Sequence, residues 1–196
     1  MLSNEIIWLI ILSYLTGALP SAVWIGKIFY KIDVREFGSG NAGATNTFRV
    51  LGKKAGIPVL CLDIFKGWLA VNYVSLLSDS LILSQNNPDM YFASKLVFGI
   101  SAVIGHLFPI YTGFRGGKGI ATMLGLLIGI HPVASLYAFV VFIIILLLSR
   151  YVSLASIISS VSFPLIVIIL GSTNISLSLF AWFVPILSLI THQKNI

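Results

Sequence analysis

The chain has 196 residues, of which 58% are hydrophobic and only 9% are charged, and its mean hydropathy is +1.02. This composition is too apolar for a soluble domain of such length, so we expect one polytopic membrane domain of the all-α class over residues 1–196. The formal net charge of +6 does not indicate nucleic-acid binding, because the basic residues gather at the ends of apolar segments, where they set membrane topology. The single cysteine, Cys61, lies in an apolar stretch, which excludes a disulfide framework and a cysteine-based metal site.

Seven apolar segments are candidates for membrane spans. We expect the first to bend at Gly17 and Pro20, because both residue types weaken a transmembrane helix. The fourth is shorter than the roughly 20 residues that a bilayer requires and ends at His131 and Pro132, so we expect a short fourth crossing. A chain with five spans, in which the short segments fold back, is the alternative. The seven segments are residues 5–26, 55–77, 91–110, 120–130, 133–149, 153–170 and 175–191.

The basic residues predict how these spans are oriented. Residues 27–54 hold six of the twelve basic residues, whereas the linker 78–90 holds two aspartates and no basic residue. By the positive-inside rule, the first of these segments faces the cytosol and the second faces the outside. We therefore expect an N-terminus outside the cell and a C-terminus in the cytosol. The first residues lack the basic region of a signal peptide, so the first apolar segment is expected to remain as a span.

A run of small residues, closed by Arg49, interrupts the apolar sequence. Its glycines let the backbone approach a ligand closely and adopt positive φ, so that successive N–H groups can form an anion-binding nest. Hydroxyl and amide side chains add short donors, and the guanidinium of Arg49 suits a phosphate. The run fits neither the Walker pattern nor a dinucleotide fingerprint, and an ordinary turn is the alternative. It consists of Gly38, Ser39, Gly40, Asn41, Ala42, Gly43, Ala44, Thr45 and Asn46.

A second glycine-rich loop is also basic. Gly116, Gly117 and Gly119 allow close approach of the backbone, and Lys118 supplies a mobile positive charge. The helix that follows adds its N-terminal dipole and, one turn on, the hydroxyl of Thr122. A positive-inside loop with turn glycines is the alternative. Because the predicted topology brings both glycine loops to the cytosolic face, we expect a site for two phosphates or for one large one.

Three of the ionisable residues within the predicted spans are candidates for a role. Asp63 and Lys66, at positions i and i+3, share one helix face. Ionisable groups at membrane depth are costly and are usually paired or functional. We favour a self-neutralising pair that orients the loops over direct catalysis by either residue. His106, near the inner end of the third span, is expected to be a hydrogen-bonded structural residue.

Four polar residues near the C-terminal spans are further candidates. Ser153 and Ser156 follow the basic turn after the fifth span and place hydroxyls at the start of the sixth, although serines in membrane helices commonly bond their own backbone. His192 and Asn195, three positions apart, either reach the same surface or form a solvated tail.

Five motifs occur in order over nearly the whole chain. They are Gly38-Ser-Gly-Asn-x-Gly-Ala-Thr-Asn46 with Arg49, Asp63-x-x-Lys66-Gly67, Gly105-His106-x-Phe-Pro109, Phe114-x-Gly-Gly-Lys118-Gly-x-Ala-Thr122 and Arg150-Tyr-Val-Ser-Leu-Ala-Ser156. In these motifs the sequence resembles the bacterial acyl-phosphate-dependent glycerol-3-phosphate acyltransferases. The resemblance implies a seven-helix enzyme of the inner membrane whose active site faces the cytosol. It also implies a basic tail beyond the final His-x-x-Asn-Ile, where this sequence ends.

The resemblance implies a reaction and its partners as well. Such an enzyme transfers a fatty acyl group from acyl phosphate to the sn-1 hydroxyl of glycerol 3-phosphate, which gives lysophosphatidic acid and phosphate in the first acylation of phospholipid synthesis. The acyl chain would lie in a groove that opens to membrane lipid. A functional link to the enzyme that makes acyl phosphate follows from the donor.

Chemistry and resemblance together suggest a role for each candidate residue. Acyl phosphate is already activated, so the enzyme must hold two anions together and place the hydroxyl beside the carbonyl. The run from Gly38 to Asn46 is expected to hold the head of acyl phosphate. Arg49, Lys118 and Ser156 are the expected catalytic residues that bind glycerol phosphate, with His192 and Asn195 near its hydroxyls.

A general base is not obvious in the sequence. No histidine is followed by an acidic residue five positions later, and no convincing Ser-His-Asp set exists. Our hypothesis is that a substrate phosphate or a weak polar group takes the hydroxyl proton. We expect neither a metal nor another cofactor. A phosphate transporter is an alternative, but it would require broken helices near the midplane and an inverted repeat. A non-enzymatic lipid-binding subunit, the other alternative, leaves the two glycine loops unexplained.

Overall fold

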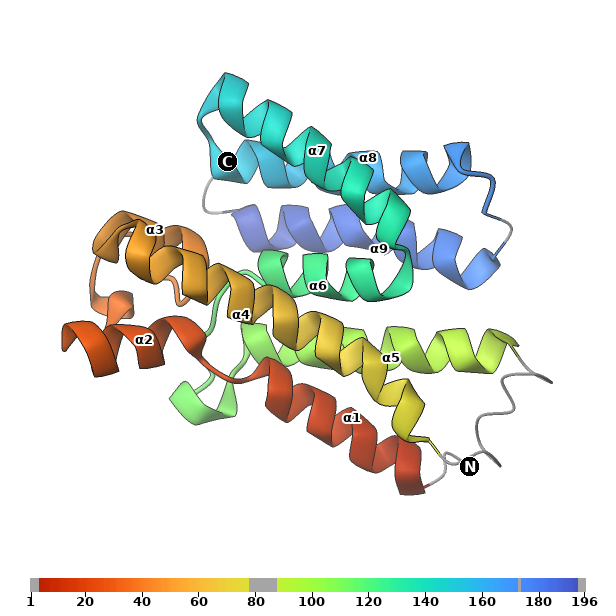
Figure 1. The fold of residues 1–196 in the computed structure, drawn as a ribbon, viewed down its shortest axis with the longest axis horizontal. Coiled ribbons are helices and arrows are strands. Elements are labelled where there is room, and N and C mark those ends of the chain that lie inside the picture. The colour runs from red at the N-terminus through yellow and green to blue at the C-terminus, as the bar shows by residue number, and fades with distance from the viewer. Residues whose placement is uncertain (1–3, 78–87, 173, 194–196) are drawn as a thin grey trace. The chain divides into compact units, whose positions relative to one another are not determined.

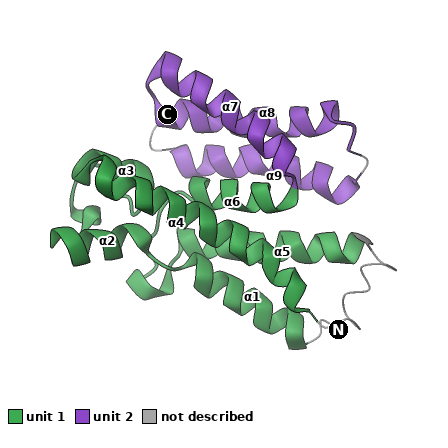
Figure 2. Cartoon of the chain, viewed as in Figure 1, with its two compact units in different colours: residues 1–130 green, residues 131–196 purple. Residues whose placement is uncertain are grey.

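The computed structural model describes residues 4–77, 88–172 and 174–193, and these residues form helices and connecting loops without a strand. The fold therefore belongs to the all-α class, as predicted. The chain divides into two compact units, residues 1–130 and residues 131–196 (Figure 2).

The first unit is built from helices that correspond to the first four predicted spans and from short helices in the polar loops between them (Figure 1). Helix α1 packs on α5, and α4 packs on both α5 and α6. These contacts place the short α6 against two longer helices, which explains how a segment of 11 residues is accommodated. The elements are α1 (Asn4–Gly17), α2 (Ser21–Tyr30), η1 (Val34–Glu36), α3 (Ala44–Leu51), α4 (Lys53–Asn72), η2 (Tyr73–Leu76), α5 (Pro88–Leu107), η4 (Ile110–Thr112) and α6 (Ile120–Ile130).

The first predicted span is broken. Helices α1 and α2 meet at an angle of 40° across residues 18–20, so the predicted bend between Gly17 and Pro20 is confirmed. Gly17 lets α1 approach α5 closely, because a Cβ at this position would collide with the backbone of Ala102. Gly105 serves the same contact from the α5 side, where a Cβ would collide with the carbonyl oxygen of Tyr14.

Small residues also bring α4 and α6 together. A Cβ at Gly67 would collide with the carbonyl oxygen of Thr122, and one at Gly125 would collide with that of Ile64. Backbones this close leave no room for side chains between the helices, which is the way apolar membrane helices pack tightly. Phe98 of α5 is fully buried in the core of this unit.

The end of the first predicted glycine loop is helical, which the sequence analysis did not anticipate. Residues from Ala44 onward form α3, whose ends are set by Gly43 before it and Gly52 after it. Phe48 on this helix packs closely on Gly56 of α4, where a Cβ would collide with the phenyl ring. Tertiary packing thus stabilises eight residues of modest helix propensity.

The second unit consists of three long apolar helices. They are α7 (Pro132–Ser149), α8 (Val152–Ile169) and α9 (Ile175–His192), and α8 packs on both α7 and α9. The His131 side chain caps α7 by accepting a hydrogen bond from the Ala134 N–H at 3.2 Å.

Length and composition agree with a multi-pass membrane protein. Five helices of the described chain are long and apolar enough to cross a membrane, and the bent α1–α2 pair makes six. The short α6 accounts for the remaining predicted segment.

Candidate active site

Asn46 holds the first glycine loop from inside. Its side chain is buried, and its Oδ1 accepts a hydrogen bond from the Ser39 N–H at 2.9 Å. Its Nδ2 donates to the carbonyl oxygens of Val34 at 2.8 Å and Phe37 at 3.1 Å. Gly38 has φ +62°, and a Cβ there would collide with Asn46 Oδ1. The amide of Asn46 therefore shapes the loop, and its direct contact with a ligand stays a prediction.

The N-terminus of α3 completes this loop. Gly43 is the N-cap, and no side chain of the described residues caps it. The first N–H groups of the helix, at Ala44, Thr45 and Asn46, have no acceptor within the helix and point out of its end. Thr45 is exposed beside them. Free N–H groups together with the helix dipole attract an anion.

The second glycine loop lies directly on the end of α5. The Gly117 N–H donates to the carbonyl oxygen of His106 at 3.1 Å. A Cβ at Gly117 would collide with the His106 ring, and one at Gly116 would collide with the carbonyl oxygen of the same histidine. Both glycines are thus required for close packing on α5. Lys118 follows directly and is half-buried.

The two loops meet. The Ala42 N–H donates to the Gly116 carbonyl oxygen at 3.4 Å. The pKa of Lys118 lies below its ordinary value, first because burial disfavours the charged amine and second because the positive charge of Arg49 is close. The two glycine loops are therefore in contact, and the Arg49 guanidinium lies close enough to influence the Lys118 amine, an arrangement that suits an anionic substrate.

An ion pair that the sequence analysis missed links the segment before the first glycine loop to the segment before the second. Asp33 caps η1 by accepting from the Arg35 N–H at 3.0 Å, and the Arg35 guanidinium donates to both of its carboxylate oxygens at 3.0 and 2.7 Å. Arg35 also donates to the Thr112 carbonyl oxygen at 2.9 Å, just before the second loop. The hydrogen bonds from Arg35 hold the pKa of Asp33 well below its usual range. The only sequence signal was an Asp-x-Arg spacing ahead of the glycines.

Asp63 and Lys66 form the predicted pair, buried in the first unit. Lys66 Nζ lies 2.9 Å from Asp63 Oδ1, and the two residues are 4% and 0% exposed. Lys66 also donates to the Leu19 carbonyl oxygen at 2.9 Å, and the Ser21 hydroxyl donates to Asp63 Oδ1 at 2.6 Å. Leu19 lies in the break between α1 and α2, and Ser21 is the first residue of α2. The pair therefore binds a backbone carbonyl within the break and a hydroxyl at the start of the next helix.

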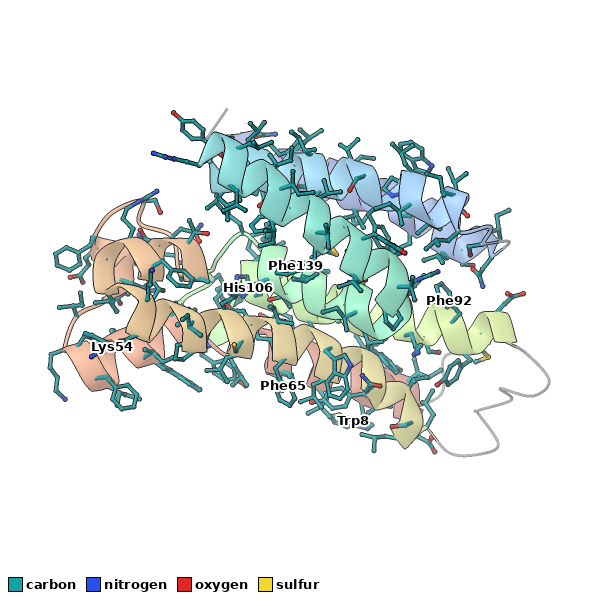
Figure 3. All side chains as sticks on the ribbon, turned by 45° about the horizontal axis from the view of Figure 1, so that its top comes forward. Trp8, Lys54, Phe65, Phe92, His106 and Phe139 are labelled. Atoms are coloured by element: carbon teal, nitrogen blue, oxygen red, sulfur yellow. The ribbon has the colours of Figure 1, made fainter. Side chains whose placement is uncertain are left out.

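His106 joins this pair to the second loop. It is buried in the interior of the unit (Figure 3), with Nδ1 3.6 Å from Asp63 Oδ1. A cavity of about 10 Å³, which is room for about one water, adjoins it. The helix break, Ala42, Lys66, His106 and the Gly116–Gly117 turn all contribute to its wall. The break, the buried pair and both glycine loops are thus neighbours.

Comparison with known proteins identifies the family. The glycerol-3-phosphate acyltransferase family model matches residues 7–196. The chain belongs to this family. The glycerol-3-phosphate acyltransferase of Enterococcus faecalis strain V583 is 44% identical over 98% of this chain and 87% of its own length. That of Staphylococcus aureus strain Newman is 42% identical over 97% of this chain and 92% of its own length.

Solved structures agree with the family. The crystal structure of PlsY (YgiH), an integral membrane glycerol 3-phosphate acyltransferase, in its glycerol 3-phosphate form superposes with a TM-score of 0.83. It is 34% identical, and the match covers 98% of this chain and 90% of that chain. The lysophosphatidic acid form of PlsY gives a TM-score of 0.81 over the same shares. This chain is therefore a multi-pass membrane acyltransferase.

The remaining candidates of this acyltransferase lie outside the two loops. The Ser156 hydroxyl donates to the Val152 carbonyl oxygen at 2.8 Å within α8, and Ser153 is half-buried near the start of the same helix. His192 is buried in α9, with Nδ1 2.8 Å from the Ser188 carbonyl oxygen. Their contacts with substrate stay predictions. Asn195 lies outside the described residues.

Thr122 of the acyltransferase is fully buried in α6, against Gly67 of α4. Its place in the contact between the two helices fits a supporting role in packing.

Proposed function

We propose that this acyltransferase moves a fatty acyl group from acyl phosphate to the sn-1 hydroxyl of glycerol 3-phosphate, giving 1-acyl-glycerol 3-phosphate and inorganic phosphate. The observation that carries the proposal is the meeting of two glycine-rich loops next to Arg49 and Lys118. Two anionic substrates require such a place, because their phosphates repel each other until positive groups surround them. The glycerol 3-phosphate and lysophosphatidic acid forms of PlsY support the acceptor and the product.

In the proposed reaction the hydroxyl oxygen attacks the carbonyl carbon of acyl phosphate. The bond between this carbon and the phosphate oxygen then breaks, and phosphate leaves with the electron pair. The proton of the hydroxyl passes to a phosphate oxygen of a substrate, so that no side-chain base is needed. The protein contributes by holding both substrates in line and by stabilising the negative charge that develops.

We assign the acyl-phosphate head to the N-terminus of α3 and to the loop before it. Lys118 and Arg49 bind the phosphate of glycerol 3-phosphate, because an amine and a guanidinium together match its charge. We also assign Ser156, His192 and Asn195 to the binding of glycerol 3-phosphate. The family model spans residues 7–196, which supports one functional domain made of both units.

The proposal includes the membrane orientation. The glycine loops face the cytosol, the N-terminus lies outside, and the enzyme resides in the bacterial inner membrane next to the source of acyl phosphate. The cluster of basic residues between positions 27 and 54 supports this orientation. A cysteine introduced at exposed Phe114 should react with an impermeant maleimide only in inside-out vesicles.

The decisive experiment uses purified protein in detergent with palmitoyl phosphate and glycerol 3-phosphate, and follows release of phosphate and lysophosphatidic acid together. Palmitoyl-coenzyme A is the parallel donor. Lys118→Ala should abolish turnover, whereas Arg115→Ala, an exposed cation of the same loop, serves as the matched control and should retain it.

Each outcome discriminates between functions. Equal amounts of both products from acyl phosphate alone support the proposal. Turnover with the coenzyme A thioester instead keeps the acyltransferase and overturns the donor. Counterflow of labelled glycerol 3-phosphate into sealed vesicles, without acylated product, favours a transporter. We expect turnover to persist in a chelator, and recovery only with added magnesium would contradict the proposed cofactor-free reaction.

A further inference from the structure

We propose that His106 is a positioning residue: the buried ion cluster around Asp63 fixes the Gly116–Gly117 turn through the His106 ring. In this way the cluster sets the affinity for the phosphate of glycerol 3-phosphate. The inference rests on the proposed function of Lys118, which follows this turn. It gives the cluster a role beyond neutralising itself.

The cluster is centred on one carboxylate oxygen. Asp63 Oδ1 lies 2.6 Å from the Ser21 hydroxyl, 2.9 Å from Lys66 Nζ and 3.6 Å from His106 Nδ1. These groups come from α2, α4 and α5. All four residues are at least nine-tenths buried, so the contacts are shielded from water. A shared charge of this kind fixes three helices relative to one another at one level of the unit.

His106 transmits this fixed position to the loop by two contacts. Its carbonyl oxygen accepts the Gly117 N–H at 3.1 Å, which holds the backbone of the turn. Its ring fills the space that a side chain at Gly117 would occupy. A Cβ built on Gly117 would collide with Nε2, and it would lie 2.9 Å from Cε1 and 3.1 Å from Cδ2. The ring thus has Asp63 on its Nδ1 side and the turn on its Nε2 side.

The same turn is linked to the first glycine loop. The Gly116 carbonyl oxygen accepts the Ala42 N–H at 3.4 Å. A shift of the turn would therefore move Lys118 directly and would disturb the neighbouring loop. Misplacing a binding group by about an ångström costs roughly a hundredfold in the most sensitive cases. We expect a smaller effect here, because the ring supports the turn without touching the substrate.

The packing of Gly117 allows a test by rescue. His106→Asn keeps amide atoms near the positions of Nδ1 and Cδ2, and removes Nε2 and Cε1, the two ring atoms nearest to a Cβ at Gly117. It should raise KM for glycerol 3-phosphate about tenfold with little change in kcat, the signature of weakened ground-state binding. Gly117→Ala should raise KM further when His106 is present. In the double variant His106→Asn/Gly117→Ala the collision with Nε2 and Cε1 is absent, so KM should fall back close to that of His106→Asn alone.

Gly116→Ala is the matched control for this rescue. Its Cβ would collide with the backbone carbonyl oxygens of His106 and Leu107, which no substitution of the histidine side chain removes. Its effect should therefore add to that of His106→Asn. Tyr73→Phe controls for stability, because it removes the hydrogen bond between Tyr73 and Thr16, another contact between helices of the same unit. Tyr73→Phe should lower the melting temperature about as much as His106→Asn does, but it should leave KM for glycerol 3-phosphate unchanged.

The outcomes separate the two proposals. If Lys118→Ala retains turnover with an unchanged KM for glycerol 3-phosphate, the proposed function of this lysine is wrong. If Lys118→Ala abolishes turnover but His106→Asn changes only the melting temperature, the positioning role is wrong. Additive effects of His106→Asn and Gly117→Ala also overturn it. Where Gly117→Ala does not fold, His106→Asn decides alone: raised KM supports the inference, and KM like that of Tyr73→Phe overturns it.

Discussion

The buried pair between α4 and the α1–α2 break predicts a large loss of stability when Lys66 is replaced by methionine. Lys66→Met keeps the length of the side chain but leaves the carboxylate of Asp63 without its cation, and it frees the Leu19 carbonyl oxygen. Removing one partner of a buried ion pair typically lowers the free energy of unfolding by about 3–5 kcal/mol. At the lower end of that range, the melting temperature of a chain of this size falls by roughly 6–12 °C.

Scanning fluorimetry of the purified protein in one detergent measures this loss. Lys95→Met is the matched control, since Lys95 is another lysine of a span that donates to a carbonyl oxygen, that of Gly129, at 3.2 Å. In the described part of the chain no carboxylate lies within ion-pair distance of it. Its replacement should lower the free energy of unfolding by only about 1 kcal/mol.

The double variant Asp63→Asn/Lys66→Met tests the electrostatic cause. It removes both charges, so it should be more stable than Lys66→Met alone, because an isolated buried charge costs more than a neutral pair of the same shape. The reasoning is refuted if Lys66→Met melts no lower than Lys95→Met. It is also refuted if the stability lost in the double variant equals the sum of the losses in Asp63→Asn and Lys66→Met measured separately.

Three further predictions concern the loops. The Asp33 carboxylate pairs with two cations, Arg35, which is mostly buried, and Lys27, which is exposed. Arg35→Met should lower the free energy of unfolding by about 2–3 kcal/mol. Lys27→Met should lower it by less than about 1 kcal/mol, and thermal unfolding measures both losses. Asn46→Ala removes three hydrogen bonds from the first loop and should raise KM for acyl phosphate roughly tenfold, measured at saturating glycerol 3-phosphate. Because burial and Arg49 lower the pKa of Lys118, its amine loses the proton at a lower pH than a free lysine, so KM for glycerol 3-phosphate should rise at a lower pH than titration of a free lysine would give. Arg49→Gln should move this rise to higher pH; a midpoint that stays in place would contradict the coupling.

Much of the fold is predictable from local sequence. Apolar length identified the segments that become the long helices, and the glycine and proline at positions 17 and 20 predicted the break that separates α1 from α2. The spacing of Asp63 and Lys66 predicted their pairing, because i and i+3 positions of a helix meet whatever the tertiary structure. These successes rest on physics that acts within one helix or between a helix and lipid.

The polar framework of the site was not predictable in the same way. Ser21 bonds to a carboxylate 42 positions away, and Arg35 bonds to a carbonyl oxygen 77 positions away. No local pattern distinguishes these partners from ordinary polar residues. The interpretation of Asn46 as a phosphate ligand came from its place in a glycine-rich run, whereas its burial directs its amide to the loop backbone. Helix α3 was missed because its packing on α4 stabilises it, and no pattern within its own residues indicates that packing.

The glycine loops present a physical difficulty that their buried neighbours resolve. Glycines permit close approach to a phosphate, but they also leave a chain with more conformations to lose on binding, which weakens affinity. Each loop is therefore supported from behind by a buried residue: Asn46 binds the backbone of the first loop, and His106 packs against the second. In the proposed reaction neither residue supplies the charge that meets the substrate. Substitutions of Asn46 and His106 should thus weaken substrate binding without altering which substrates are accepted, whereas substitutions of Lys118 or Arg49 should alter both.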